Sequence, residues 1–267
     1  MNTLLLAAGG EEPPKTIFTP LWEKVKDTEW GQWFGFDQMD RHLGQFWFEA
    51  ICFSMMAATF LIIISAIATR KYNNVPGGVQ NLLEWAVGLL RNLVRGFIGE
   101  QGDKYLPYLG TVFLFIFCMN IMGLIPTFRS PTMTLSTTAA LGVVTFVMVQ
   151  FYAVRDTGLI PYLKHFMGDI LWLAPLMVVV EIVGEFARPL SLSLRLFGNI
   201  FGEDMVIENL LHMGQGIWIP IQIPMMAFAI FGSFLQAFIF TCLASLYIGQ
   251  KVVHEHEEGH GDESHGH

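Results

Sequence analysis

The residues best suited to chemistry are charged side chains inside an otherwise apolar stretch, VVVEIVGEFARPLSLSLRLFGNIFGED, residues 178–204. In a bilayer, a charged side chain at the centre of a helix costs about 2.5 to 3.5 kcal/mol on insertion scales, so it requires a partner, water or a function. Steps of three or four residues place most of these polar side chains within about a third of the helix circumference. This polar stripe consists of Glu181, Glu185, Arg188, Ser191, Arg195, Asn199 and Glu203, with Asp204 on its flank.

The charges of the stripe differ in whether the helix itself can neutralise them. Glu185 and Arg188 are close enough on one helix to pair, so a purely structural pairing explains them as well as a functional one. Arg195 has Ser191 and Asn199 at the positions four residues away, so its counter-charge has to come from elsewhere. Because a guanidinium does not release its proton, Arg195 suits a fixed positive barrier that favours the ionised form of an approaching carboxylate and stops a free cation.

The composition places this stripe in a membrane protein. Of 267 residues, 53% are hydrophobic and only 14% are charged, against about 25% charged in soluble domains. The net charge of −8 does not argue for nucleic acid, which we do not expect as a partner, and much of the acidity lies in the C-terminal run. The three cysteines lie inside apolar stretches and are expected to be core residues. We expect no metal site and no cofactor.

Long apolar runs predict an all-α integral membrane protein with about five transmembrane helices, because a bilayer core of about 30 Å takes roughly 20 apolar residues per helix. The fourth run would stretch to about twice the hydrocarbon thickness, so it has to tilt, bend or break, with a bend expected at Pro189. The predicted runs are 50–69, 108–125, 133–154, about 166–211 and about 217–249.

One more helix, about 76–100, is expected to lie in the membrane interface, because its polar and basic residues share one arc and its apolar residues fill the rest. Three regions follow: an N-terminal segment, 1–45, a transmembrane domain, 46–250, and a disordered tail rich in His and acids, 251–267. The distribution of Lys and Arg favours an N-terminus outside the cell and a C-terminus in the cytoplasm.

Several motifs resemble one known family. PLSLSLRLFGN, residues 189–199, closely resembles the signature of subunit a of the F-type, rotary ATP synthase of bacteria. The resemblance extends over most of the chain through four further motifs. These are NLLEW (81–85), NIMGLIP (120–126), SPTMTLSTTAAL (130–141) and LQAFIF (235–240).

The resemblance implies a non-catalytic stator subunit that translocates an ion, most simply a proton, and couples its flow to rotation and ATP synthesis. Its implied partners are a c-subunit ring with one membrane carboxylate per subunit, the b-subunit peripheral stalk, the other ATP synthase subunits and the lipid bilayer. The last two long helices would lie tilted along the ring. The implied location is the bacterial plasma membrane, and the implied path consists of two aqueous half-channels.

The resemblance also assigns residue roles. Arg195 matches the essential arginine, Gln236 the glutamine that faces it, and Glu181 an acid of one half-channel. Either Glu203 or Asp204 matches the acid of the other half-channel. One position departs from the family: Ala229 stands where some members have a polar residue.

Weaker candidates and other functions stay open. Glu185, Arg188, Ser191 and Ser233 are assigned supporting roles, and Asn199 joins the translocation residues. The hydroxyl residues of 130–138 line a half-channel or bond to their own backbone. Gln236 with Ser233 also suits plain interhelical hydrogen bonding. The rival functions are a stand-alone proton antiporter or channel and a purely structural membrane subunit. The choice of proton or sodium and the size of the ring stay open too.

Overall fold

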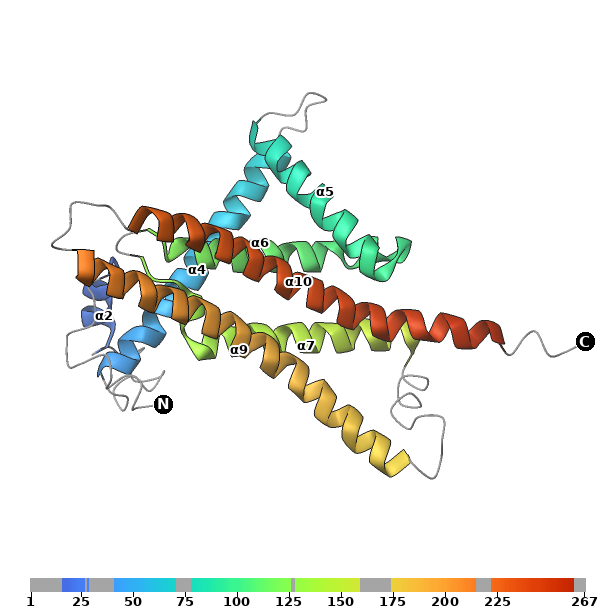
Figure 1. The fold of residues 1–267 in the computed structure, drawn as a ribbon. Helices are drawn as coiled ribbons and strands as arrows, with labels where there is room; N and C mark the ends of the chain where they lie inside the picture. The colour runs from blue at the N-terminus through green and yellow to red at the C-terminus, as the bar shows by residue number, and fades with distance from the viewer. Residues whose placement is uncertain are drawn as a thin grey trace, which may run out of the picture.

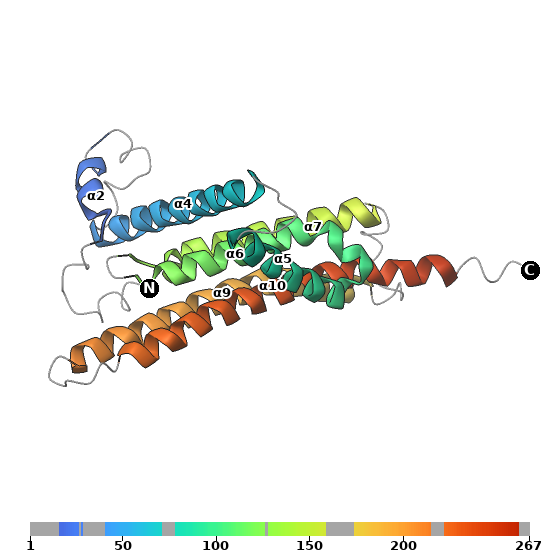
Figure 2. The same ribbon diagram turned by 90° about the horizontal axis from the view of Figure 1, so that it is seen from above.

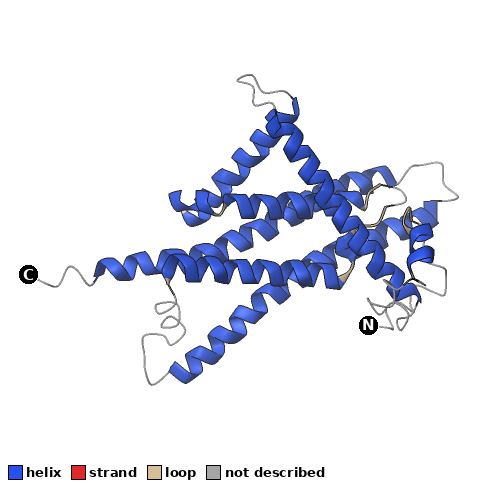
Figure 3. Cartoon of the chain, turned by 180° about the vertical axis from the view of Figure 1, so that it is seen from behind, coloured by secondary structure: helices blue, strands red, loops and turns tan. Residues whose placement is uncertain are grey.

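The structure, a computed structural model, describes residues 16–26, 28, 41–70, 78–125, 128–158, 174–214 and 222–261. These residues form helices and short connections without a strand, which confirms the all-α prediction (Figure 3). The elements are α2 (Thr19–Val25), α4 (Arg41–Arg70), α5 (Gly78–Ile98), the 3-10 helix η1 (Glu100–Lys104), α6 (Leu106–Met122), the 3-10 helix η2 (Pro131–Met133), α7 (Leu135–Thr157), α9 (Ala174–Gly214) and α10 (Gln222–Gly261).

Three of these helices are long and apolar enough to cross a membrane. The crossing segments are Gly44–Ile67 in α4, Leu135–Asp156 in α7 and Pro224–Lys251 in α10. α6 is apolar but has only 17 residues, and α9 carries the charges of the stripe along its 41 residues. The five predicted runs therefore correspond to α4, α6, α7, α9 and α10, and the predicted interfacial helix corresponds to α5.

The last helix differs from the predicted boundary. α10 continues to Gly261, so residues 251–261 are helical where the sequence predicted a disordered tail from 251 onward. The physical reason is that residues 251–258 contain neither glycine nor proline, so each residue adds one backbone hydrogen bond to an existing helix. Residues 262–267, most of the N-terminal segment 1–45 and the predicted start of the long helix before 174 lie outside the described residues.

The helices stack in three layers (Figure 2). α9 and α10 lie side by side and antiparallel in one outer layer, α6 and α7 form the middle layer, and α4 lies on the opposite side. The larger apolar core joins all of these layers through Phe53 of α4, Ile116 of α6, Leu196 of α9 and Phe240 of α10. A smaller core packs α5 against the C-terminal parts of α7 and α10.

We name the two ends of this bundle by their elements. The α5 end contains α5, η1 and the later part of α10, and the η2 end contains α2, η2 and the start of α4 (Figure 1). α9 runs from the α5 end to the η2 end, and its first turns diverge from α7. This divergence leaves the beginning of α9 without close neighbours among the described helices and exposes residues such as Val179 and Val183.

α9 and α7 approach closely where the helix contains Pro189. α9 is continuous through Pro189, whose carbonyl oxygen accepts a 2.6 Å hydrogen bond from Ser193 Oγ. A Cβ atom on Gly142 of α7 would lie 2.9 Å from that carbonyl oxygen and 2.2 Å from Ser193 Oγ. Glycine at position 142 therefore allows the contact that fixes α9 against the middle layer.

Candidate functional site

Contacts between α9 and α10 recur at regular levels along the antiparallel pair. Glu185 meets Lys251 at the α5 end, and about four turns further along α9 Asn199 donates a 2.7 Å hydrogen bond from Nδ2 to Oε1 of Gln236. At the η2 end the Glu203 carboxylate lies beside Gly232, where a Cβ atom would be 3.4 Å from Oε2. These contacts fix the register in which the polar stripe meets α10.

At the α5 end four side chains form a group in which Glu185 and Lys251 are almost fully buried. We call it the Glu185 cluster, and its members are Gln150, Glu185, Arg188 and Lys251. Glu185 Oε1 lies 3.0 Å from Arg188 Nη1 and 2.7 Å from Lys251 Nζ, and Gln150 donates to Glu185 Oε2. The Arg188 guanidinium also lies over the Tyr247 ring, 5.2 Å from its centroid. The predicted pairing of Glu185 with Arg188 is therefore present, with Lys251 as a second cation.

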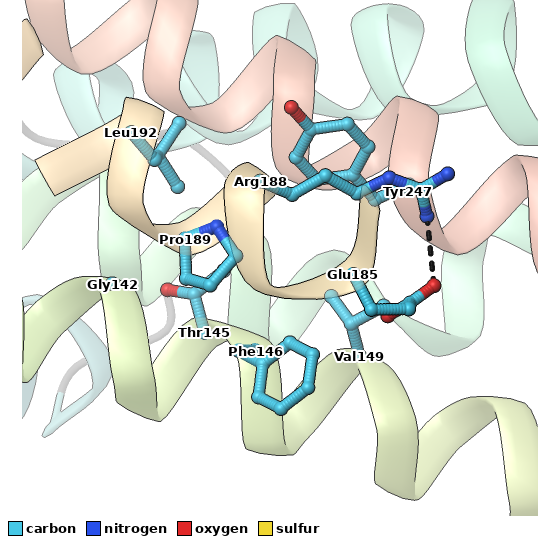
Figure 4. A pocket seen from close by; sticks show the side chains of 9 residues that line it. All are labelled: Gly142, Thr145, Phe146, Val149, Glu185, Arg188, Pro189, Leu192 and Tyr247. Carbon is cyan, nitrogen blue, oxygen red and sulfur yellow. Dashed lines mark hydrogen bonds and ion pairs between the residues drawn. The ribbon is translucent and has the colours of Figure 1, made fainter. Parts of the chain in front are cut away.

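A small cavity, partly open to the surface, borders this cluster between α7, α9 and α10 (Figure 4). Glu185 and Arg188 from α9 lie on one side of it, and Phe146 and Thr145 from α7 lie on the other. Glu181, one turn earlier on α9, is half-buried and lies in the part of the helix that diverges from α7. It makes no ion pair or hydrogen bond with the residues that the structure describes.

Arg195 lies midway along α9 on an exposed apolar surface. We call this surface the outer face. Its members are the exposed residues Leu190, Ser191, Leu194, Arg195, Gly198 and Gly202 of α9 and Phe228, Phe231 and Leu235 of α10. Within the described part of the chain, Arg195 has neither an ion pair nor a hydrogen bond. Its guanidinium is therefore a cation without a counter-charge among the residues that the structure describes.

At the η2 end the stripe reaches a second hollow, which is partly open to the surface and which we call the η2 cavity. Its polar lining comes from α6, the start of η2, α9 and α10: Asn120, Ser130, Glu203, Asp204 and Ser233. Glu203 Oε1 and Asn120 Nδ2 are buried there without a hydrogen-bond partner. Buried polar atoms usually have hydrogen-bond partners, so the η2 cavity suits a bound water that bonds to these two atoms.

The hydroxyl residues near η2 satisfy most of their hydrogen bonds inside the protein. Thr132 donates to Asn120 Oδ1 at 2.8 Å, Ser130 donates to the Met119 carbonyl oxygen at 3.1 Å, and Thr138 donates to the Leu135 carbonyl oxygen at 3.0 Å. Of these hydroxyl residues, Ser130 is the one that also lines the η2 cavity. The contribution of this segment to the cavity is therefore small.

A third polar group at the η2 end was not singled out from the sequence. Glu49 of α4 is fully buried and accepts hydrogen bonds from Thr16 Oγ1 at 2.6 Å and Gln45 Nε2 at 2.8 Å. Arg129 Nη1 lies 3.6 Å from Glu49 Oε2, and the Arg129 guanidinium covers the Phe46 ring. The available signal was Gln45 four residues before Glu49, a spacing that lets the two side chains meet on one helix.

The α5 end also carries a charged group outside the membrane-spanning segments. Arg91 and Arg95 of α5 each donate two hydrogen bonds to the Asp103 carboxylate in η1. These hydrogen bonds hold the pKa of Asp103 well below its usual range. The group is exposed, so it fastens η1 to α5 at the surface. Among the described residues, no group of three His, Cys, Asp or Glu side chains is arranged for a metal ion.

The structure thus separates the predicted stripe into three parts. Glu185 and Arg188 belong to the buried cluster at the α5 end, Arg195 and Ser191 belong to the outer face, and the acids of the η2 cavity form the third part. Gln236 is buried and bonds to Asn199, one turn beyond Arg195. Ser233 and Glu203 both belong to the lining of the η2 cavity.

Comparisons with known proteins agree on one family. Residues 51–249 match the family described as ATP synthase A chain. The chain is 40% identical to the ATP synthase subunit a of Geobacter sulfurreducens over 215 residues, which cover 80% of this chain and 92% of the relative. It is 40% identical to that of Geotalea daltonii over 212 residues, 79% and 89% of the two chains. The ATP synthase subunit a of Protochlamydia amoebophila is 38% identical over 224 residues, 79% and 82% of the two chains.

Proposed function

The chain belongs to the ATP synthase A chain family, whose members are ion-translocating parts of the membrane sector, and from this premise we propose how its own residues translocate the ion. The outer face meets a ring of c subunits, and Arg195 faces the membrane carboxylate that each ring subunit presents. The ion is a proton, and the chain itself catalyses no reaction. Its role is to couple ion flow to the rotation that drives ATP synthesis.

The observation that carries this proposal is the exposed guanidinium of Arg195 on an apolar face. An arginine at the centre of a membrane costs about 2.5 to 3.5 kcal/mol on insertion scales unless its charge is paired or hydrated. Arg195 has no partner within the described residues, so a counter-charge from another subunit is required. A ring carboxylate supplies it, and the permanent positive charge keeps that carboxylate ionised while the two groups face each other.

Two polar regions at opposite ends of α9 support two half-channels. The η2 cavity forms one, in which Glu203 and Asp204 exchange protons with water. The α5 end, with Glu181, forms the other. An ion that enters through one region neutralises a ring carboxylate, travels with the ring and leaves through the other region. The membrane potential supplies about 2.3 kcal/mol per charge per 100 mV, so several ions are summed for each ATP.

The surroundings of the chain follow from the same proposal. The basic α5 end lies in the cytoplasm of a bacterial cell, the N-terminus lies outside, and the bilayer is the plasma membrane. The b-subunit stalk and the other ATP synthase subunits hold the chain against the turning ring. The η2 cavity then opens to the outside and the α5 end opens to the cytoplasm.

The test is Arg195→Ala in membrane vesicles that contain the complete ATP synthase. We expect ATP-driven proton pumping to be lost while the complex still assembles, and Arg195→Lys to fail as well, because a desolvated lysine can release its proton. Leu194→Ala, a change at an exposed neighbour on the same face, is the matched control and retains pumping. Normal pumping by Arg195→Ala would overturn the proposal.

A second test addresses the half-channels. Neutral variants of Glu181, Glu203 and Asp204 should slow proton transport without uncoupling it, since water in a polar path can reroute around one missing acid. A triple variant that carries all three changes and still transports protons at the parental rate would contradict the half-channel assignment.

A further inference from the structure

The η2 cavity contains two buried polar atoms that come from different helices. Asn120 of α6 is 3% exposed, and its Nδ2 has no hydrogen-bond partner among the residues that the structure describes. Glu203 of α9 is partly buried, and within the same described residues its Oε1 has no partner either. The amide nitrogen is a donor and the carboxylate oxygen is an acceptor. A water that accepts from Asn120 and donates to Glu203 satisfies both atoms.

The orientation of the Asn120 amide decides which of its two ends serves the cavity. Its Oδ1 accepts a 2.8 Å hydrogen bond from Thr132 Oγ1, so Nδ2 is the end left for the cavity. An amide turned by 180° would instead bring its oxygen to a lining that contains the acids Glu203 and Asp204. Carboxylate oxygens are acceptors as well, so that arrangement would lack a donor. The orientation in the structure therefore matches the chemistry of the lining.

Thr132, in η2, is held firmly against α6. Its side chain is completely buried, and Ser130 Oγ lies 2.6 Å from its hydroxyl oxygen. Gly123 of α6 permits this close approach, because a Cβ atom at position 123 would lie 2.8 Å from the Cβ atom of Ser130. The Thr132 hydroxyl therefore has a fixed position from which it donates to Asn120.

We propose that Thr132 is a positioning residue for a water in the η2 cavity. Thr132 fixes the Asn120 amide, Asn120 Nδ2 donates to the water, and the water directs one of its O–H bonds to Glu203 Oε1. Thr132 is absent from the cavity lining, so it acts through Asn120 and does not touch the water. The role in transport rests on the proposed function, in which Glu203 belongs to the half-channel at the η2 end.

The first experiment detects the water without reference to transport. The full chain, with its asparagines labelled with ¹⁵N, is reconstituted in lipid bilayers, and solid-state NMR measures the transfer of magnetisation from water to side-chain amides at short mixing times. The Asn120 signal is the one that disappears in Asn120→Leu. We expect transfer to this signal in the parent chain, and an Asn120 amide without any transfer from water overturns the inference.

The decisive comparison changes the hydroxyl of Thr132 and keeps its shape. Thr132→Val removes the donor to Asn120 Oδ1, so the amide is free to turn and its NH₂ group should lose most of the transfer from water. Thr132→Ser keeps the hydroxyl and should restore the transfer. Thr138→Val is the matched control, because Thr138 is also completely buried but donates to the backbone of its own helix. Parental transfer in Thr132→Val, or equal losses in Thr132→Val and Thr138→Val, overturns the inference.

The second experiment measures ATP-driven proton pumping by the complete ATP synthase in inverted vesicles. Thr132→Val should slow pumping about fivefold, the factor that corresponds to one ordinary hydrogen bond, whereas Thr132→Ser and Thr138→Val should pump at the parental rate. Parental pumping by Thr132→Val overturns the role in transport. Arg195→Ala in the same vesicles separates the two levels, since normal pumping by that variant contradicts the proposed function itself.

A failure of Thr132→Val to accumulate in the membrane also decides between the alternatives. Thr132→Ala, which lacks the same hydroxyl and leaves more space, then takes its place in both experiments with the same expected losses. If neither variant accumulates while Thr138→Val does, Thr132 serves folding alone and the inference is overturned.

Discussion

The hydrogen bond between Asn199 and Gln236 offers a direct measure of how firmly α9 is held against α10. Gln236 is 2% exposed, and its Oε1 accepts from Asn199 Nδ2 at 2.7 Å. Asn199→Ala therefore leaves a buried carbonyl oxygen without a partner. Gln236→Leu removes the acceptor and fills a similar volume, so its cost should be smaller.

The expected coupling energy follows from the setting of the bond. Interhelical hydrogen bonds in membranes contribute about 0.6 kcal/mol on average and at most about 1.7 kcal/mol. An unpaired buried acceptor costs about 1 to 3 kcal/mol. Because Gln236 is almost fully buried, we expect a coupling energy of about 1 kcal/mol between the two positions, with Asn199→Ala more destabilising than Gln236→Leu.

The assay is a double-mutant cycle on the purified chain, in which unfolding by sodium dodecyl sulfate in mixed micelles is followed by circular dichroism. The cycle contains Asn199→Ala, Gln236→Leu and the double variant. Asn209→Ala is the matched control, because Asn209 donates to the Met205 carbonyl oxygen in its own helix. The changes in the free energy of unfolding of the two single variants could sum to that of the double variant within about 0.3 kcal/mol. This result would refute the reasoning, because sites that do not interact show such additivity.

Three further changes test other contacts. Gly142→Ala should destabilise the chain by about 1 to 3 kcal/mol, because the new Cβ atom would collide with α9. Gly184→Ala is the control and should not destabilise it, because no heavy atom lies within 4 Å of a Cβ atom there. Thermal unfolding compares the two variants, and equal losses of stability would contradict the close approach of α7 and α9. Glu49→Gln should lower the midpoint of thermal unfolding, because it removes the buried negative charge that lies 3.6 Å from Arg129 Nη1. An unchanged midpoint would mean that this ion pair adds no stability. Asp103→Asn should speed amide hydrogen exchange in η1, because it removes the carboxylate that binds Arg91 and Arg95. Acid should speed exchange in the parent protein as well. The pKa of Asp103 is lowered in the folded state, so its ionised carboxylate stabilises η1 above the usual Asp pKa of about 3.9, and this stability is lost as the pH falls below that value. Parental exchange rates in the variant would count against this.

The sequence was sufficient to predict the helices, because their signals are local. Apolar runs and the arc of polar residues in 76–100 correspond to α4, α5, α6, α7 and α10, and the charged periodicity of residues 178–204 lies within α9. The end of α10 was placed too early because charged and His residues suggested disorder, although nothing in residues 251–258 interrupts a helix.

The contacts between helices could not be predicted in the same way. Periodicity showed that the polar residues share one side of α9, but it contains no information on the register of α10. Gln236 was expected opposite Arg195 and bonds to Asn199. Lys251 was taken as the beginning of the tail, yet its side chain reaches Glu185 in α9, 66 positions earlier in the sequence. Such partners depend on packing between segments that are far apart in the sequence.

The most direct test of the central proposal is a disulfide cross-link between the outer face and the ring. Leu194→Cys lies beside Arg195 and is 48% exposed, and the second cysteine replaces a ring residue one turn from its membrane carboxylate. Ile62→Cys in α4, 68% exposed and in the layer furthest from α9, is the control. We predict oxidative cross-linking between the chain and the ring at position 194 and none at position 62. Cross-linking at neither position in vesicles that still pump protons, or equal cross-linking at both, would contradict the placement of Arg195 against the ring.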